Sequence, residues 1–310
     1  MTVQIDVVRS GVTESIHEAS LVVLDSADGP AHRWGRTDMV AFARSALKPL
    51  QATAMVRAGL RLRPELLAIA CSSHNAAPPH VAAASAVLAQ AGLDPSYLRC
   101  PPAVPRSGPA RIEYLRAGGT ADSLHHECSG KHSAMLATCA ANEWPLDTYL
   151  EPDHPLQVAI RDTVEELTGD VISASGVDGC GAPTHAVTLA GLARGFSRLA
   201  VDDSPDGVAA AMRAFPQLIG GDGRDVTAAM QAAPGLIVKD GAEGIYGLAL
   251  PDGRAAAFKI HDGGYRAAPP LVLGILRYWG VEVEPTSWGE TPVLGRGKPV
   301  GSIRLHGRAL

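Results

Sequence analysis

Hydrophobic and polar positions change their spacing twice along the chain. Val3–Val8 and Ile16–Leu24 alternate as strands do. From position 46 to position 232, apolar residues recur mostly at the spacing of helices. Strand patterns return beyond position 235, and two of them are joined by the turn sequence Pro251-Asp252-Gly253. The pattern therefore predicts strands at both ends of the chain and helices between them.

The helices expected in the central region are rich in alanine and leucine. They are Ala46–Ala58, Pro64–Ala70, Pro79–Ala91, Gly130–Ala141, Pro155–Leu167, His185–Leu199, Pro205–Ala214 and Arg224–Ala232. The later elements are strands at Leu236–Lys239, Ile245–Leu250, Ala255–Ile260 and Val300–Leu305, with a helix at Pro269–Trp279 before the last strand. This order predicts an α/β fold of the α+β kind, in which one sheet is built from both termini and a helical lobe is inserted in the middle.

We expect a single domain over residues 1–310, because the sequence has no internal repeat, low-complexity tract or obvious linker. Its sheet lobe would comprise about residues 1–44 and 235–310, and its helical lobe about residues 45–234. A cleft between two lobes is a natural place for a site. Ser45 falls at the first crossing from the sheet to the helices.

Composition and charge narrow the class of protein. The apolar share is 46% and the charged share 19%, as in ordinary soluble globular proteins. A net charge of −5 with interspersed signs argues against a nucleic-acid surface or an anionic membrane as partner. The N-terminus does not resemble a secretory signal, and the longest uncharged stretch, Leu66–Leu93, is too polar to span a bilayer. Five cysteines in such a chain predict reduced thiols in the cytoplasm.

Ser45 and Lys48 are the first candidates for chemistry. Ser45 is favoured at a helix start, and Pro49 is tolerated only in a first turn, so a helix begins close to Ser45. Residues three apart share a helix face, which brings the Lys48 amine towards the Ser45 hydroxyl. A neutral lysine can remove the proton of a serine nucleophile, provided that desolvation or a second cation lowers its pKa. Ser-x-x-Lys also occurs by chance, so the pair needs a supporting structural context.

Three further segments are dense in functional groups. Cys71-Ser72-Ser73-His74-Asn75 follows a buried apolar run, although a packed cysteine beside a helix cap is the plainer interpretation. Glu127–Ser133 and Asp178–Thr184 each lead into a helix start, where a cysteine favours its thiolate form. Cys128 and Cys180 share a metal, form a disulfide or merely pack. Their spacing does not decide, because neither segment has the C-x-x-C of a structural zinc site.

Lys239 and Lys259 lie on or beside the late strands. Lys259 has apolar neighbours near a strand end, although an exposed lysine on a sheet edge is the plainer interpretation. The sequence contains no G-x-G-x-x-G, Walker, H-E-x-x-H or G-x-S-x-G motif. The usual dinucleotide, phosphate, zincin and hydrolase-elbow interpretations are therefore excluded.

Several segments, in order along nearly the whole chain, together resemble the L-asparaginase II family of rhizobial-type, thermolabile asparaginases. They are Arg44–Pro49, Cys71–His74, Cys128–His132, Asp178–Thr184, Gly241–Gly244 and Lys259–Gly263. The resemblance implies a fold similar to serine β-lactamases, penicillin-binding proteins and glutaminases. It also implies hydrolysis of L-asparagine to L-aspartate and ammonia by a homodimer.

The same resemblance implies roles for individual residues. Two Ser–Lys pairs would carry catalysis, Ser45 with Lys48 and Ser73 with Lys259. A zinc ion would be held beside the substrate by Cys128, Lys131 and Cys180, with Lys131 neutral. The substrate pocket would be lined by Arg44, His132 and Asp178. No organic cofactor is implied.

These groups form a coherent mechanism. Two lysines close together depress each other's pKa, so one can act as a base. Ser45 would attack the asparagine amide while Lys48 takes its proton, and water would then hydrolyse the acyl-enzyme. Ser73 and Lys259 would relay protons or orient the first pair. The zinc would position the substrate rather than activate water, because two thiolate ligands reduce its Lewis acidity.

Two other functions compete with this prediction. A glutaminase or a β-lactamase-like amidase or esterase would use the same Ser-x-x-Lys, and the shape of the cleft would distinguish them. A non-catalytic amino-acid-binding or zinc-binding protein would need only the cysteine cluster. The presence of both serines and both lysines argues against it, because a binding module has no use for proton transfer.

Overall fold

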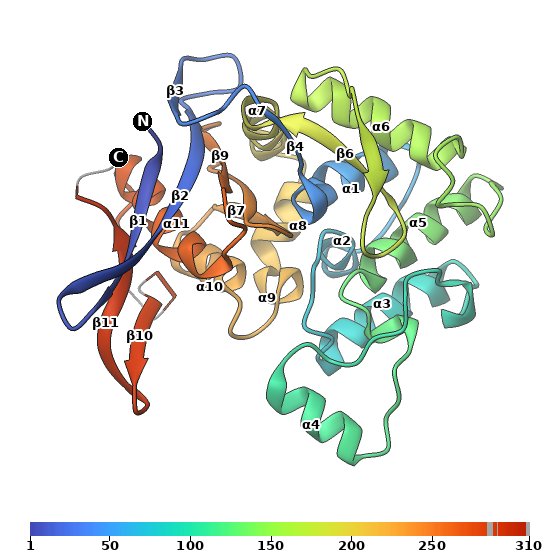
Figure 1. The fold of residues 1–310 in the computed structure, drawn as a ribbon. Helices are drawn as coiled ribbons and strands as arrows, with labels where there is room; N and C mark the ends of the chain where they lie inside the picture. The colour runs from blue at the N-terminus through green and yellow to red at the C-terminus, as the bar shows by residue number, and fades with distance from the viewer. Residues whose placement is uncertain (284–287, 290, 308–310) are drawn as a thin grey trace.

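Strands from both ends of the chain lie together in one antiparallel sheet, and the helices of the middle lie beside it (Figure 1). The computed structural model describes residues 1–283, 288–289 and 291–307. The strand order of the large sheet is β10-β11-β1-β2-β9-β8-β7, and β3 pairs with β2. The predicted α+β architecture, with a sheet from both termini and helices inserted between them, is confirmed.

The large sheet is formed by strands on either side of the helical region. They are β1 (Val3–Arg9), β2 (Val12–Leu24), β3 (Ala31–Trp34), β7 (Ile237–Gly241), β8 (Ile245–Ala249), β9 (Ala255–Ile260), β10 (Thr291–Gly295) and β11 (Lys298–Leu305). A smaller sheet has the order β4-β6-β5 and lies among the helices. Its strands are β4 (Val40–Phe42), β5 (Ser175–Val177) and β6 (Pro183–Thr188).

Most helices come from the segment between the two halves of the large sheet. They are α1 (Lys48–Arg57), α2 (Pro64–Ala70), α3 (Pro78–Gln90), α4 (Gly108–Arg116), α5 (Ser129–Ala141), α6 (Pro155–Thr168), α7 (Leu189–Ala200), α8 (Val208–Ala214), α9 (Pro216–Ile219) and α10 (Asp225–Ala232). Helix α11 (Ala268–Tyr278) follows β9. Short 3₁₀ helices are η1 (Arg44–Leu47), η2 (Pro95–Tyr97), η3 (Ser123–His125) and η4 (Tyr265–Ala267). None of the helices in the described ranges is both long and apolar enough to cross a membrane.

Small side chains let helices approach the late strands closely. Every residue of β7 and β8 is buried. A Cβ atom added to Gly247 of β8 would lie 2.3 Å from the ring of Phe196 on α7, so only glycine allows this contact. Between β8 and β9, Tyr246 stacks on Phe258 with ring centroids 4.9 Å apart. The late strands are therefore packed closely against one another and against α7.

The helix predicted over His185–Leu199 is wrong in its first part. Residues up to Thr188 belong to β6, which pairs with β4 through Phe42–Ala186 and with β5 through Ser175–His185. The side chain of Thr188 then accepts a hydrogen bond from the backbone N–H of Gly191 and so caps α7. The strand was missed because its partners are distant in sequence and its apolar residues merge with those of the helix.

Helix α4 and strand β10 were not predicted. Helix α4 has no buried residue, so it carries no apolar stripe that could reveal it. It projects at the lower edge of the molecule (Figure 1). Its start is nevertheless marked, because Ser107 caps the helix and Pro109 lies in the first turn.

Candidate active site

A strained turn leads from β4 into the first helix of the central region. Arg44 has a φ angle of 52°, which is uncommon for a residue other than glycine and is found often at functional sites. The 3₁₀ helix η1 follows, and α1 then begins at Lys48 with Pro49 in its first turn. The predicted helix start near Ser45 is confirmed, but the Ser45 side chain does not cap it.

Strand β7 packs directly against this turn. A Cβ atom added to Gly241 would lie 2.5 Å from the carbonyl oxygen of Ala43 and 3.1 Å from the backbone nitrogen of Ala46. The close approach requires glycine at this position. The last residues of β7 are therefore held beside the start of α1.

The Lys48 amine lies at the centre of the site. Its side chain is buried, and Nζ donates hydrogen bonds to the carbonyl of Ser72 at 2.5 Å, to Oγ of Ser73 at 3.0 Å and to Sγ of Cys128 at 3.2 Å. Three donors on one ammonium group are thus matched by three acceptors. The predicted contact between Lys48 and Ser45 is not formed, because the three acceptors draw the amine towards Ser73. The half-buried Ser45 hydroxyl has no hydrogen-bond partner among the described residues.

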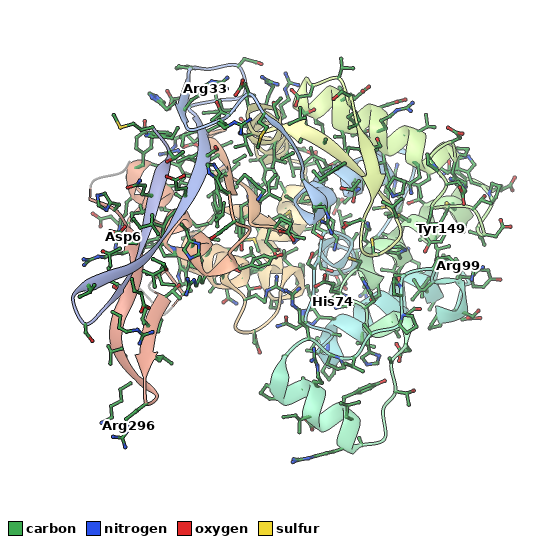
Figure 2. All side chains as sticks on the ribbon, in the orientation of Figure 1. Asp6, Arg33, His74, Arg99, Tyr149 and Arg296 are labelled. Carbon is green, nitrogen blue, oxygen red and sulfur yellow. The ribbon has the colours of Figure 1, made fainter. Side chains whose placement is uncertain are left out.

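The segment that carries Ser73 is fixed by its neighbours on both sides. The backbone N–H of Ser73 donates to the carbonyl of Ile219, and the N–H of His74 donates to that of Glu127. The buried His74 ring lies among the helices (Figure 2), and its Nε2 is 3.0 Å from Oγ of Ser129. Burial lowers the pKa of His74 well below its ordinary value, so the ring is neutral. The segment therefore reaches the start of α5, where Cys128 lies.

The predicted pairing of Ser73 with Lys259 is not present. The Lys259 amine donates to the backbone carbonyls of Glu243 and Ile260, each at 2.6 Å. Lys259 lies on β9, which β8 separates from β7. The apolar neighbours of Lys259 in the sequence reflect its place inside the sheet rather than a place at the site.

Lys239 on β7 lies beside the site instead. Its side chain is completely buried, and burial lowers its pKa to about 8. The neighbouring Asp240 opposes this shift, while the charge of Lys48 adds to it. Such an amine loses its proton near neutral pH. A signal was present in the sequence, because a lysine that follows the apolar run Leu236-Ile237-Val238 is costly to bury unless it has a partner or a function.

Replacing Lys239 by methionine is expected to lower kcat for the amide hydrolysis that the sequence resemblance implies by about 100-fold, because the site loses its readily neutralised amine. The matched change Lys259→Met should alter kcat less than about threefold, since that amine donates hydrogen bonds to two backbone carbonyls and to no side chain of the described residues. Steady-state kinetics of both variants would check this. A large loss of kcat in Lys259→Met, with kcat of Lys239→Met unchanged, would instead support the predicted pairing of Ser73 with Lys259.

The two cysteines of the predicted metal site lie beside Lys131. Nζ of Lys131 donates to Sγ of Cys180 at 3.3 Å. A hydrogen bond from the Cys128 thiol lowers the pKa of Cys180, and the charge of Lys131 lowers it further. The same bond, together with burial, raises the pKa of Cys128. All five cysteines are free thiols, so the disulfide alternative for this pair is not realised.

His132 is buried behind the cysteines. Its Nδ1 lies 2.7 Å from the hydroxyl of Tyr149, and this hydroxyl accepts the backbone N–H of Arg99 at 3.1 Å. Figure 2 shows Tyr149 and Arg99 side by side. The Tyr149 proton is therefore directed to Nδ1, which leaves the His132 proton on Nε2. Burial lowers the pKa of His132 to about 4, so the ring is neutral.

Arg44 and Asp178 form an ion pair at the same site. Nε of Arg44 donates to Oδ1 of Asp178 at 2.6 Å, and the charge of Asp178 also reaches Lys131. The Asp178 side chain is largely buried, while that of Arg44 is partly open to solvent. The predicted pocket residues Arg44 and Asp178 are thus brought together, and His132 lies deeper in the protein.

The donor set suits zinc in its chemistry. Two cysteine thiolates are ligands that zinc takes in proteins, a lysine amine is an unusual nitrogen ligand that must be neutral to coordinate, and three protein ligands would leave one position open. Within the described ranges, no three His, Cys, Asp or Glu side chains form a metal-binding group, so a metal ion held by these two cysteines would need Lys131 as a further ligand. Burial alone would lower the pKa of Lys131, but the two sulfurs raise it overall. A bound metal ion would reverse this effect by replacing the proton.

The sequence was compared with models of known protein families. The model described as L-asparaginase II matches residues 5–305. The chain belongs to the L-asparaginase II family. Family membership confirms the resemblance inferred from the sequence motifs, and it makes this L-asparaginase II family member an amidohydrolase. No curated protein sequence matches the chain significantly.

Solved structures similar to this L-asparaginase II family member include glutaminases. A probable glutaminase from Bacillus subtilis, complexed with 6-diazo-5-oxo-L-norleucine, has 12% identity and a TM-score of 0.42, over 86% of this chain and 85% of that chain. Mglu in its native form has 12% identity and a TM-score of 0.40, over 87% of this chain and 67% of that chain. Scores and identities this low support no conclusion about this chain.

Proposed function

We propose that this protein hydrolyses L-asparagine to L-aspartate and ammonia through a serine ester. The observation that carries the proposal is the buried Lys48 amine, which donates to Oγ of Ser73 at 3.0 Å beside the start of α1, where Ser45 lies. Family membership and this cluster of serine and lysine side chains support an amidohydrolase of the Ser–Lys type.

In the first half of the reaction, Ser45 Oγ bonds to the side-chain carbonyl carbon of asparagine. Its proton passes to an amine of the site, and the carbon–nitrogen bond then breaks as the leaving nitrogen takes up a proton and departs as ammonia. The Ser73 hydroxyl is suited to carry protons, because it is hydrogen-bonded to Lys48. The backbone N–H of Ser45 is our candidate donor to the oxyanion.

In the second half, water attacks the ester carbon, and its proton passes to the same amine system. The Ser45 oxygen leaves with a proton, and L-aspartate is released. A base must be neutral before it can accept a proton. Lys239, with its pKa lowered to about 8 by burial, is the amine of the site best suited to be neutral.

Arg44 and Asp178 suit the two charged groups of an amino-acid substrate. A guanidinium binds a carboxylate, and a carboxylate binds an ammonium group, so the pair would exchange its own ion pair for contacts with the zwitterion. The partial exposure of Arg44 makes it reachable from solvent. Substrate selection would therefore depend on these two side chains.

Zinc remains part of the proposal, with Cys128, Lys131 and Cys180 as its ligands. When bound, it would supply a fixed positive charge beside the substrate. His132 would donate a hydrogen bond to Cys180, because its Nε2 carries a proton and has no other hydrogen-bond partner in the part of the chain that the structure describes. We also propose that the protein is a homodimer and that it is located in the cytoplasm. Free buried thiols agree with a reducing compartment.

Replacing Cys180 by serine is expected to weaken zinc binding by at least about tenfold, because a thiolate ligand is lost. Cys139→Ser is the matched control, since Cys139 is also buried but lies outside the cluster. Competition with a chromogenic chelator would measure affinity, and elemental analysis would give the zinc content of each protein. Equal zinc affinity in both variants would remove Cys180 as a ligand. Chelation that leaves rate and substrate affinity untouched would remove zinc from the function.

The proposed function is tested by ammonia release from L-asparagine and, in parallel, from L-glutamine, with the zinc content of the protein measured. We expect release from asparagine and little from glutamine. The opposite preference would indicate a glutaminase. No ammonia release from either substrate, with folded and zinc-loaded protein, would favour another amidase or a binding protein.

A further inference from the structure

Arg224 joins two segments of the site that are distant in sequence. It immediately precedes α10, and its side chain is largely buried. One terminal nitrogen donates to the carbonyl of Ser73 at 2.9 Å, and the other donates to Oδ2 of Asp240 on β7 at 2.6 Å. The first nitrogen is also 3.5 Å from Oδ1 of Asn75. A single guanidinium thus ties the Ser73 segment to strand β7.

Asp240 completes the connection to the buried lysine of the strand. Its Oδ1 accepts a hydrogen bond from Lys239, whose amine also donates to the carbonyl of Asp240 at 2.8 Å. The two carboxylate oxygens are therefore divided between Lys239 and Arg224. The chain of contacts runs from the backbone of Ser73 through Arg224 and Asp240 to the Lys239 amine, and it uses directed, charge-assisted hydrogen bonds.

The titratable side chains around Lys239 come from several elements. Asp240 belongs to the same strand, Lys48 belongs to α1, and Arg224 precedes α10, while the Cys71 thiol lies at the end of α2. Burial would raise the pKa of Asp240, but Lys239 and Arg224 lower it overall, so it is a carboxylate. Beyond it lies a second buried acid.

That second acid, Asp225, accepts a hydrogen bond from the hydroxyl of Tyr246 at 2.8 Å. Burial, and next the charge of Asp240, raise the pKa of Asp225. Asp240 is the carboxylate that contacts both Lys239 and Arg224. The charge of Lys48 also acts on it, so one carboxylate lies among three basic side chains. Such an arrangement favours the neutral form of one amine.

We propose that Arg224 and Asp240 are positioning residues for amide hydrolysis, whose ion pair holds the Ser73 hydroxyl and the Lys239 amine in place around the Lys48 amine. The inference rests on the proposed function. A buried ion pair is weak evidence for stability, because apolar replacements of similar volume are often as stable. Its directed contacts with both candidate proton-carrying segments make positioning the better explanation.

The first experiment compares Arg224→Met, Arg224→Lys and the wild-type enzyme in asparagine hydrolysis. Arg224→Met should lower kcat about 30-fold or more with KM changed less than about threefold, because misplacement affects the transition state more than binding. Arg224→Lys should recover part of this loss, since it keeps the charge but not both contacts. The matched control is Arg213→Met, because Arg213 is a half-buried arginine that, among the described residues, donates hydrogen bonds to the carbonyls of Gly235 and Ala200 and to no side chain.

The second experiment measures kcat/KM against pH for Asp240→Asn. The amide keeps an acceptor oxygen for one of its partners but removes the negative charge that favours protonated Lys239. The rise of activity that follows Lys239 deprotonation should therefore move to lower pH, by about one unit. A purely structural role would lower activity at every pH and leave the position of the rise unchanged.

The outcomes separate this inference from the proposed function. Wild-type protein that releases no ammonia would overturn both. Active wild type, with Arg224→Met and Arg213→Met equally affected in kcat and in melting temperature, would overturn the inference alone. An unshifted profile in Asp240→Asn would overturn the role of Asp240. A selective loss in Arg224→Met, partial rescue by lysine and a shifted profile would establish it.

Discussion

Replacing Lys48 by methionine is expected to lower kcat for asparagine hydrolysis by about 1,000-fold or more. The amine is hydrogen-bonded to Ser73 and Cys128 and lies one helical turn from Ser45, so the substitution removes the amine that contacts the Ser73 hydroxyl beside the nucleophile. Substrate binding should change little, because Arg44 and Asp178 do not contact Lys48 through any hydrogen bond among the described residues. Steady-state kinetics would show a fall in kcat with a nearly constant KM.

The same substitution should leave the fold intact. Lys48 is almost completely buried, so methionine removes a buried charge, but it also leaves the carbonyl of Ser72 and Oγ of Ser73 without this donor. The two effects oppose each other, so thermal unfolding of the variant should stay close to that of the wild type, with Lys259→Met as the control for a lysine removed elsewhere. If Lys48→Met does not fold, its loss of activity says nothing about catalysis. Lys48→Arg would then replace it, because arginine keeps the positive charge but cannot give up its proton to act as a base. Full activity in Lys48→Arg would exclude Lys48 as a base.

The fold could be predicted from the sequence as far as local patterns allow. Helix α2 begins at Pro64 and ends at Ala70, as its apolar run and leading proline indicated. Strand β9 likewise matches the prediction over Ala255–Ile260. The small sheet could not be predicted, because β4 and β6 are separated by most of the helical region and their pairing is visible only in three dimensions.

The candidate site shows the same division between local and distant information. The grouping of Cys128 with Lys131 follows from positions one helical turn apart, but the approach of Cys180 depends on the loop before β6. Lys239 and Lys259 are both lysines in apolar strands, and their different surroundings arise from strand order. Strand β7 lies at the end of the sheet beside η1, whereas β9 lies further inside. Strand order is not encoded in either segment alone.

Ser45→Ala is expected to abolish turnover, with kcat lower by at least about 1,000-fold, because no serine ester can then form at this position. Ser73→Ala should be less damaging, with a loss of about 100-fold, because a relayed proton can be replaced in part by water. The structural reason is accessibility. Ser45 is half-buried with no hydrogen-bond partner for its hydroxyl among the described residues, whereas Ser73 is 3% exposed and is hydrogen-bonded to Lys48.

The position of the ester distinguishes the two serines more directly than the rates do. Rapid acid quenching during turnover, followed by mass spectrometry of peptides, should find the mass of an aspartyl ester on the peptide that contains Ser45. An ester on the Ser73 peptide, with Ser45→Ala still active, would exchange the roles of the serines. Lys48 would then contact its nucleophile directly, and the 3.0 Å hydrogen bond would join the nucleophile to its base.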